Sequence, residues 1–134
     1  MQPIYQALPK ANGLVLGSPI YLDHITAQAK TFIDRPYPYL GPALEHRFPK
    51  HVKLVTVLTQ GHGNPAAYRF VGDWLDRTLN SYFDLETVET VYAAGCNGPG
   101  ALEQRRDLLD HAAQAGVRLA SAMANAPRNP PGSS

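Results

Sequence analysis

Gly13-Leu14-Val15-Leu16-Gly17 opens the unit that decides the fold of this 134-residue chain. The run is apolar throughout rather than alternating, as expected of a strand that is covered on both faces. The loop Ser18-Pro19-Ile20-Tyr21-Leu22 follows, and a helix is predicted after it, with Asp23 as its N-cap and Pro36 ending it near Asp34-Arg35. The apolar positions expected to face the sheet from this helix are Ile25, Ala29, Phe32 and Ile33.

The same order of apolar run, Gly-rich loop and helical segment occurs twice more. The second unit has a strand at 53–59 and a loop at 60–64, and Asn64-Pro65 is expected to begin its helix. The third has a strand at 88–94 and a loop at 95–100. This alternation predicts βαβ units around a parallel sheet, and hence an α/β fold.

Two residues in the later helices carry specific expectations. Trp74 falls in the apolar stripe of the second helix and is predicted to be a core residue rather than a ligand-stacking one. Leu102 and Leu109 mark the third helix, in which Gly116 either caps the helix or sits in a close contact.

The rest of the chain is predicted to complete a single domain over residues 1–123. Ile4 and Leu8, with Tyr5, suggest the last turns of a helix that ends at Pro9, so the domain is expected to be N-terminally truncated. The proline-rich loop 36–51 is either functional or a crossover that packs its aromatic side chains. Residues 124–134 are rich in Pro, Asn, Gly and Ser and are expected to form a disordered tail.

Composition excludes several classes of function. The formal net charge is +1 with no long block of one sign, which argues against nucleic-acid and membrane-surface binding. Cys96 is the one cysteine, so no internal disulfide and no thiolate metal cage is expected, and a reducing, cytoplasmic location is predicted. The five histidines form no metal-binding pattern.

The block from Gly13 to Tyr21, followed by Thr26-Ala27-Gln28-Ala29-Lys30-Thr31-Phe32-Ile33-Asp34-Arg35, resembles the central block of flavodoxin-like NADPH-dependent FMN reductases, nearest the iron–sulfur flavoprotein branch. The resemblance continues more weakly through Thr59-Gln60-Gly61 to about residue 123. It implies a three-layer flavodoxin-like parallel sheet. It also implies an FMN-dependent oxidoreductase that passes electrons from NAD(P)H to a small-molecule acceptor such as a quinone or a flavin.

In that family the loop after Ser-Pro-aromatic wraps the isoalloxazine ring, and a second loop lets the backbone approach it closely. Carried onto this chain, the resemblance implies cofactor contacts by two groups of residues. They are Ser18, Pro19, Ile20, Tyr21, Leu22, Asp23 and His24 in the first loop, and Thr59, Gln60 and Gly61 in the second. His62 is the best histidine for touching a flavin or substrate, although a solvent-exposed loop residue is the alternative.

Two departures from the family pattern stand beside this interpretation. The family usually has small residues after the aromatic one, whereas this chain has Leu22-Asp23-His24, and Asp23 is expected to point away as an N-cap. The family also begins with a strand and a Ser/Thr-rich loop that binds the FMN phosphate at a helix N-terminus. No such segment precedes Gly13, and the upstream cysteine cluster of iron–sulfur members is missing as well.

These departures leave a rival hypothesis, a non-catalytic flavodoxin-like domain that acts by pairing. Residues 13–17 are apolar on both faces and uncharged, yet the strand that normally pairs there is not visible in the sequence. Natural sheet edges are usually protected by charge, bulges or proline. Homo-oligomerisation, most simply a dimer, is therefore expected through residues 13–17.

Overall fold

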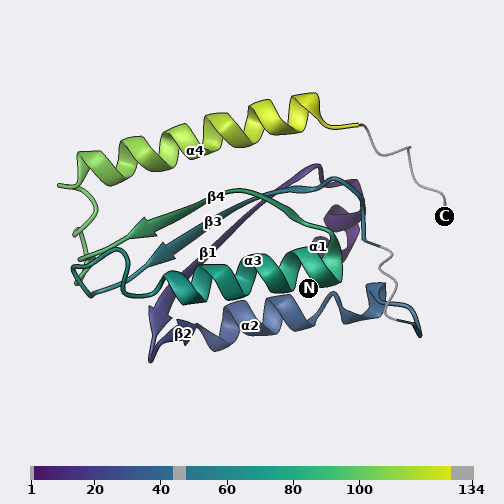
Figure 1. The fold of residues 1–134 in the computed structure, drawn as a ribbon, viewed down its shortest axis with the longest axis horizontal. Coiled ribbons are helices and arrows are strands. Elements are labelled where there is room, and N and C mark those ends of the chain that lie inside the picture. Colours follow the sequence, from purple (N-terminus) through teal and green to yellow (C-terminus); the bar gives the residue numbers. More distant parts are fainter. Residues whose placement is uncertain (1, 44–47, 128–134) are drawn as a thin grey trace.

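The computed structural model describes residues 2–43 and 48–127 and shows a sheet with helices on both faces (Figure 1). Helix α4 covers one face, while α2 and α3 lie side by side on the other. The strands are β1 (Gly13–Tyr21), β2 (His24–Ile25), β3 (Lys53–Thr59) and β4 (Glu86–Ala93). The helices are α1 (Gln2–Ala7), α2 (Ala27–Asp34), α3 (Arg69–Phe83) and α4 (Arg106–Asn125), with 3-10 turns at Leu8–Lys10 and Tyr37–Tyr39. The predicted three-layer, flavodoxin-like α/β arrangement is confirmed.

The three main strands are parallel and contiguous, as predicted. The sheet order is β2-β1-β3-β4, and the register pairs Gly13 with Lys53 at one end and Pro19 with Thr59 at the other. β2 is an addition that the sequence did not predict, and it pairs antiparallel with the end of β1. The sheet is therefore mixed rather than wholly parallel.

The predicted loop after residue 17 is largely strand. β1 continues through Tyr21, and Leu22 and Asp23 form the turn of a hairpin that returns along β2. Asp23 is not the N-cap of the next helix; that residue is Thr26, whose side chain accepts a hydrogen bond from the Ala29 amide. Helix α2 ends at Asp34 with Arg35 as its C-cap. This agrees with the prediction that Pro36 stops the helix near Asp34-Arg35.

Helix α3, which belongs to the second predicted unit, begins later than predicted. Asn64 caps a turn instead, because its Oδ1 accepts from the Ala66 amide over 2.9 Å, and α3 starts at Arg69. Trp74 is half-buried and packs against the main core, in line with its predicted role.

Helix α4, which belongs to the third predicted unit, differs from the prediction at both ends. Leu102 lies in the turn that precedes α4, and Gly116 lies inside the helix, where an added Cβ would meet no atom within 4 Å. Gly116 is therefore neither a cap nor a close contact. The helix runs to Asn125, so it includes the first two positions of the predicted tail; residues 128–134 of that tail lie outside the described residues.

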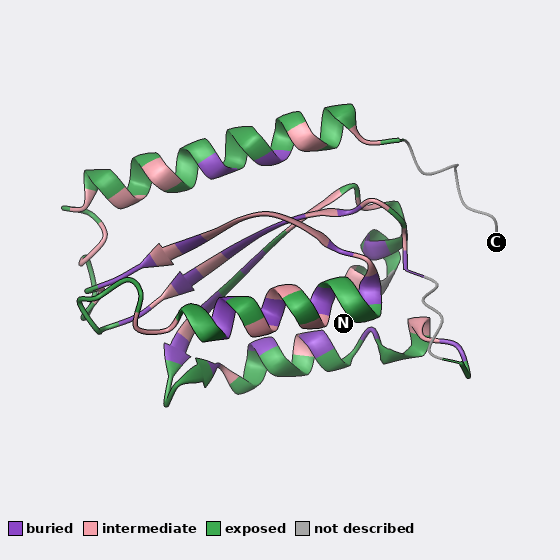
Figure 2. Cartoon of the chain, viewed as in Figure 1, coloured by how far each residue is buried: buried purple, intermediate pink, exposed green. Residues whose placement is uncertain are grey.

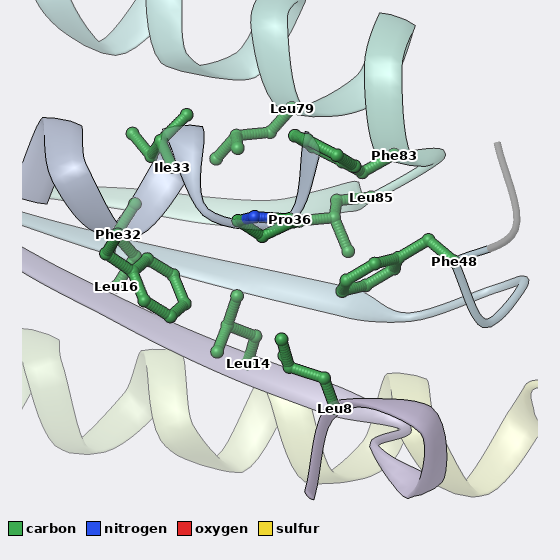
Figure 3. A pocket seen from close by; sticks show the side chains of 10 residues that line it. All are labelled: Leu8, Leu14, Leu16, Phe32, Ile33, Pro36, Phe48, Leu79, Phe83 and Leu85. Carbon is green, nitrogen blue, oxygen red and sulfur yellow. The ribbon is translucent and has the colours of Figure 1, made fainter. Parts of the chain in front are cut away.

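The core lies chiefly between the sheet and the α2/α3 layer (Figure 2). Its apolar packing leaves a cavity of about 10 Å³, which is shown in Figure 3. That volume is at the limit of one water molecule, and the apolar walls offer no partner for one. The cavity is lined by Leu8, Leu14, Leu16, Phe32, Ile33, Pro36, Phe48, Leu79, Phe83 and Leu85.

The described part of the proline-rich loop supports the packing interpretation of its aromatic residues. Phe48 is buried, and its ring meets the ring of Tyr39 at 5.7 Å and that of Phe83 at 5.6 Å between centroids. Tyr37 stays exposed, and residues 44–47 lie outside the described residues.

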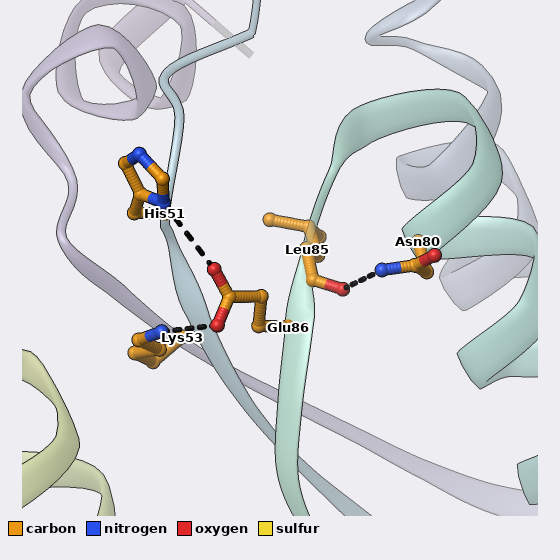
Figure 4. Close-up of polar contacts among 5 residues, drawn as sticks. All are labelled: His51, Lys53, Asn80, Leu85 and Glu86. Atoms are coloured by element: carbon orange, nitrogen blue, oxygen red, sulfur yellow. Dashed lines mark hydrogen bonds and ion pairs between the residues drawn. The ribbon is translucent and has the colours of Figure 1, made fainter. Parts of the chain in front are cut away.

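The carboxylate of Glu86 joins the amino ends of β3 and β4 through its contacts with Lys53 and His51 (Figure 4). Glu86 pairs with Lys53 through one oxygen and lies 3.4 Å from His51 Nδ1 through the other. The hydrogen bond from Lys53 is the main reason that the pKa of Glu86 lies below its ordinary value. This cluster fixes the end of the sheet opposite to the candidate site.

Candidate functional site

The carboxyl ends of the three parallel strands meet at one edge of the sheet. Pro19 is level with Thr59, and Thr59 is level with Ala93, so the segments that follow these residues emerge side by side. In open α/β sheets this edge is where ligands bind. The candidate site therefore comprises the hairpin 20–25 and the loops 60–64 and 94–100.

The hairpin turn presents strained and exposed residues. Leu22 and Asp23 have φ values of 47° and 63°, in the left-handed region that a two-residue hairpin turn requires at both positions. Leu22 is fully exposed, and Tyr21 is 66% exposed. Aspartate tolerates this conformation far better than leucine does, so the strain of the turn falls mainly on Leu22.

The base of the hairpin is fixed by a serine whose hydroxyl is already occupied. The buried Ser18 Oγ accepts from the Thr26 amide over 3.1 Å and donates to the Pro19 carbonyl over 2.9 Å. Ile20 is also buried and belongs to the core. The side chains of Ser18 and Ile20 therefore support the hairpin, whereas Tyr21, Leu22, Asp23 and His24 are exposed on it.

A ring contact joins the hairpin to α3. The His24 imidazole meets the Trp74 indole edge to face, with 4.5 Å between the ring centroids. Since Trp74 is the one tryptophan of the chain, its fluorescence reports on the position of the hairpin.

The loop after β3 is organised by a buried amide. Gln60 Nε2 donates to the carbonyl oxygens of His62 at 3.2 Å and Asn64 at 2.6 Å, which curls the loop around the side chain. Gln60 Oε1 is buried without a hydrogen-bond partner in the described structure. The side chain of Gln60 thus holds the loop together, and the contact of this residue with a flavin stays a prediction. His62 is exposed, and its Nδ1 accepts from the Asn64 amide.

The loops after β3 and β4 are tied to each other. The Cys96 amide donates to the Gln60 carbonyl, and the Gly95 amide donates to the His62 carbonyl. Asn97 adds a side-chain bond to the Gly61 carbonyl over 2.9 Å. Asn97 was not singled out from the sequence, because a polar residue in a Gly-rich loop gives no signal of the residue it will contact.

Arg105 is a second residue that the sequence analysis missed. Its Nη1 donates to the Ala94 carbonyl over 3.1 Å, while Nε and Nη2 bind both carboxylate oxygens of Asp107. This two-point contact raises the pKa of Arg105 and lowers that of Asp107. The guanidinium thereby anchors the end of β4 to the start of α4.

These residues fit a flat, amphipathic ring. The hairpin and the two loops bring together exposed apolar side chains and peptide groups in tight turns. The charged residues of the candidate site fit a phosphate group less well than its apolar residues fit the ring. Arg105 is already neutralised by Asp107, and the hairpin itself carries the carboxylate of Asp23.

The described residues hold neither a candidate metal cluster nor a helix able to cross a membrane. Within residues 2–43 and 48–127 we find no group of three or more His, Cys, Asp or Glu side chains placed to hold a metal ion. No helix in the described part of the chain is both long and apolar enough to span a bilayer.

Comparison with solved structures places the fold in the flavodoxin-like class. The structure superposes on the apo form of an NADH:FMN oxidoreductase with a TM-score of 0.64 at 21% identity, covering 96% of this chain and 61% of that one. It also superposes on an oxidoreductase from Corynebacterium diphtheriae with a TM-score of 0.61 at 23% identity, covering 94% and 63% of the two chains.

A curated relative gives the family resemblance. The chain is 31% identical over 124 residues to an iron–sulfur flavoprotein of Archaeoglobus fulgidus, a match that covers 91% of this chain and 51% of the relative. The chain thus spans about half the length of that protein. No family model matches the sequence. The expected resemblance to flavodoxin-like NADPH-dependent FMN reductases and iron–sulfur flavoproteins is confirmed.

Proposed function

We propose that this chain is the flavin-ring-binding part of an FMN-dependent oxidoreductase that passes electrons from NAD(P)H to a quinone, a flavin or a similar acceptor. One observation carries the proposal. An exposed, strained hairpin at Tyr21 to His24 stands at the same sheet edge as the Gly-rich loop 60–64. Strained backbone of this kind persists where the surrounding structure holds it, and it concentrates at binding sites. The names of the similar proteins, a flavoprotein and an NADH:FMN oxidoreductase, agree with it.

The residues have distinct roles in this proposal. The backbone from Ile20 to His24 pairs with the polar edge of the ring, and Tyr21 packs against its face. Thr59 and Gly61 bring the second loop close to the ring, and Gln60 keeps that loop in shape. When bound, the flavin supplies the hydride and electron transfer, and the protein supplies binding and exclusion of water. The single cysteine agrees with a reducing, cytoplasmic location, which is part of the proposal.

The test measures FMN binding through quenching of Trp74 fluorescence. Tyr21→Ala and Pro19→Ala should each weaken binding, because one removes a ring contact and the other loosens the strand before the hairpin. Tyr82→Ala is the matched control, since Tyr82 is an exposed aromatic residue on α3 away from the hairpin. Circular dichroism confirms that each variant is folded. Unchanged FMN affinity in both hairpin variants would refute the assignment.

A second candidate function is a non-catalytic domain that acts by pairing with itself or with another chain. The observation that favours it is the 60% exposure of Val15 in the middle of an apolar strand. The two candidates differ in a simple measurement. A flavin-binding oxidoreductase shows saturable quenching of Trp74 fluorescence when it is titrated with FMN, even where binding is weak, and a pairing domain shows none.

A further inference from the structure

A polar pocket of about 500 Å³ lies against β4, the last strand in the order of the sheet. Its walls come from the loop after β3, from β4 and the residues that follow it, and from the starts of α3 and α4, which lie on opposite faces of the sheet (Figure 1). Gly63 and Gly95 belong both to this lining and to the loops of the candidate site. The pocket therefore adjoins the surface that we propose for the flavin ring.

The pocket contains one arginine that no carboxylate neutralises. Arg105 binds both oxygens of Asp107, and His111 lies 2.6 Å from a carboxylate oxygen of Glu89. The guanidinium of Arg69, by contrast, has no ion-pair partner in the part of the chain that the structure describes. Since Asp107 is the acidic residue of the lining, the pocket has a surplus of positive charge.

Arg69 is held in position although it is exposed. Its guanidinium carbon lies 5.8 Å from the centre of the Tyr92 ring, and the Tyr92 hydroxyl donates to the Arg69 carbonyl over 3.3 Å. Stacking on an aromatic ring uses the face of a guanidinium and leaves the N–H groups in its plane free to bind. Those N–H groups form a fork that matches two oxygens of a phosphate group. The carboxylates of Asp73 and Asp76 also act on Tyr92, but neither lines the pocket.

The pocket lies within reach of a dinucleotide whose nicotinamide ring stacks on the flavin. The hairpin follows β1, and β3 separates β1 from β4, so the hairpin and β4 are two strand spacings apart, or about 10 Å. NAD(P)H carries its phosphate groups beyond the ribose of the nicotinamide, toward the adenosine end. A nicotinamide ring near the hairpin therefore leaves these groups free to extend past the loop 60–64 to Arg69.

We propose that this pocket binds a phosphate group of the NAD(P)H donor and that Arg69 is the residue that pairs with it. The inference rests on the proposed function, because that function supplies the dinucleotide. Two phosphate groups have the required chemistry: the pyrophosphate that NADH and NADPH share, and the 2′-phosphate that only NADPH carries. Both present anionic oxygens to the same guanidinium, and the experiment distinguishes them.

The first test is calorimetric titration of the chain, without flavin, with ADP and with 2′,5′-ADP. Arg69→Gln should weaken binding about tenfold to a hundredfold, which is the effect of losing one charge-assisted hydrogen bond. A loss confined to 2′,5′-ADP assigns Arg69 to the 2′-phosphate, and an equal loss for both ligands assigns it to the phosphates at the 5′ position. Arg77→Gln is the matched control, because Arg77 is also exposed on α3 but does not line the pocket.

The second test is titration of the same variants with FMN, followed by Trp74 fluorescence. Arg69→Gln should leave FMN affinity unchanged, and circular dichroism should show that both variants are folded. Three results would overturn the proposal: no binding of either nucleotide to the unmodified chain, equal losses in Arg69→Gln and Arg77→Gln, or a loss of FMN affinity in Arg69→Gln, which would make the flavin phosphate the occupant. Arg69-dependent nucleotide binding without any FMN binding would refute the flavin site and leave this phosphate site standing.

Discussion

Asn97 donates a hydrogen bond from its side-chain amide to the carbonyl oxygen of Gly61 over 2.9 Å, across 36 positions of sequence. The same side chain occupies the space above Gly61, since a Cβ added there would lie 2.3 Å from Asn97 Oδ1. The two loops at the candidate site are therefore matched to each other: one lacks a side chain where the other inserts one.

This match predicts non-additive effects of mutation. Asn97→Ala should lower the free energy of unfolding by about 1 kcal/mol, the net value of one hydrogen bond. Gly61→Ala should cost a similar amount, because its methyl group displaces the Asn97 amide and breaks the same bond. The double variant should cost little more than Asn97→Ala alone, since the space is then empty. Urea unfolding of the four proteins measures this, and fully additive costs would show that the contact does not couple the loops.

The contacts of Gln60 predict that replacement by glutamate, which has nearly the same shape, destabilises the protein more than replacement by leucine. Its Nε2 donates to two carbonyl oxygens in a buried position, so Gln60→Glu would set a carboxylate against those oxygens despite its nearly identical shape. Gln60→Leu loses the donors without burying a charge and should cost about 1–3 kcal/mol. We expect Gln60→Glu to be the less stable of the two at neutral pH and to recover partly in acid, where the carboxyl becomes protonated. Thermal unfolding at two pH values checks this; a glutamate variant as stable as the wild type would contradict it.

The charges of the candidate site predict that the flavin phosphate contributes little to binding. Arg105 is committed to Asp107, and the hairpin carries Asp23. A fully held phosphate would add several charge-assisted hydrogen bonds of about 1.5–3 kcal/mol each. We therefore expect FMN to bind this chain weakly, with an affinity within about tenfold of that of riboflavin, which corresponds to about 1.4 kcal/mol. Parallel titrations of Trp74 fluorescence compare the two ligands. Submicromolar FMN binding with much weaker riboflavin binding would reveal a phosphate site elsewhere in the chain.

Glu86 predicts acid sensitivity at the opposite end of the sheet. The hydrogen bond from Lys53, aided by His51, lowers the pKa of Glu86 below its ordinary value of 4.5. A carboxyl group with a lowered folded-state pKa contributes stability above 4.5 and loses that contribution as the pH falls through the lowered value. Glu86→Gln should thus be less stable than the wild type at pH 7, by about 1 kcal/mol or less because the pair is partly exposed. The difference should vanish in strong acid. A constant difference across the pH range would assign the effect to packing instead.

Much of the fold could be predicted from sequence, because its signals are local. The strand at 53–59 has the predicted bounds, since a run of buried apolar residues between polar neighbours leaves little freedom of assignment. The parallel order of the three strands followed from the alternation of strands and helices. The packing of Trp74 against the core could be predicted from the helical spacing of its apolar neighbours.

The errors concern places where tertiary contacts override local signals. Pro19 suggested a loop after Gly17, but at the open edge of β1 a missing N–H costs nothing, so the strand continues to Tyr21. The hairpin turn was not predicted because Leu22 stands at a turn position where a β-hairpin usually has glycine or asparagine. Asn64-Pro65 gave a true turn that did not continue as a helix. The contacts of Asn97 and Arg105 join segments that are distant in sequence and leave no periodic trace.

Helix α4 is the longest helix in the described structure, yet it buries few side chains. Ala115 and Leu119 are its buried residues, and they meet Val55 and Val91 in a cluster far smaller than the core beneath α2 and α3. Because so few buried side chains hold α4 to the sheet, we expect this helix to detach and unfold separately from the rest of the domain. In hydrogen–deuterium exchange, the α4 amides should exchange well before those of β3 and α3, at a rate that reflects partial rather than global unfolding. The molecule would then exist for brief periods with one face of its sheet uncovered while the other layer stays intact.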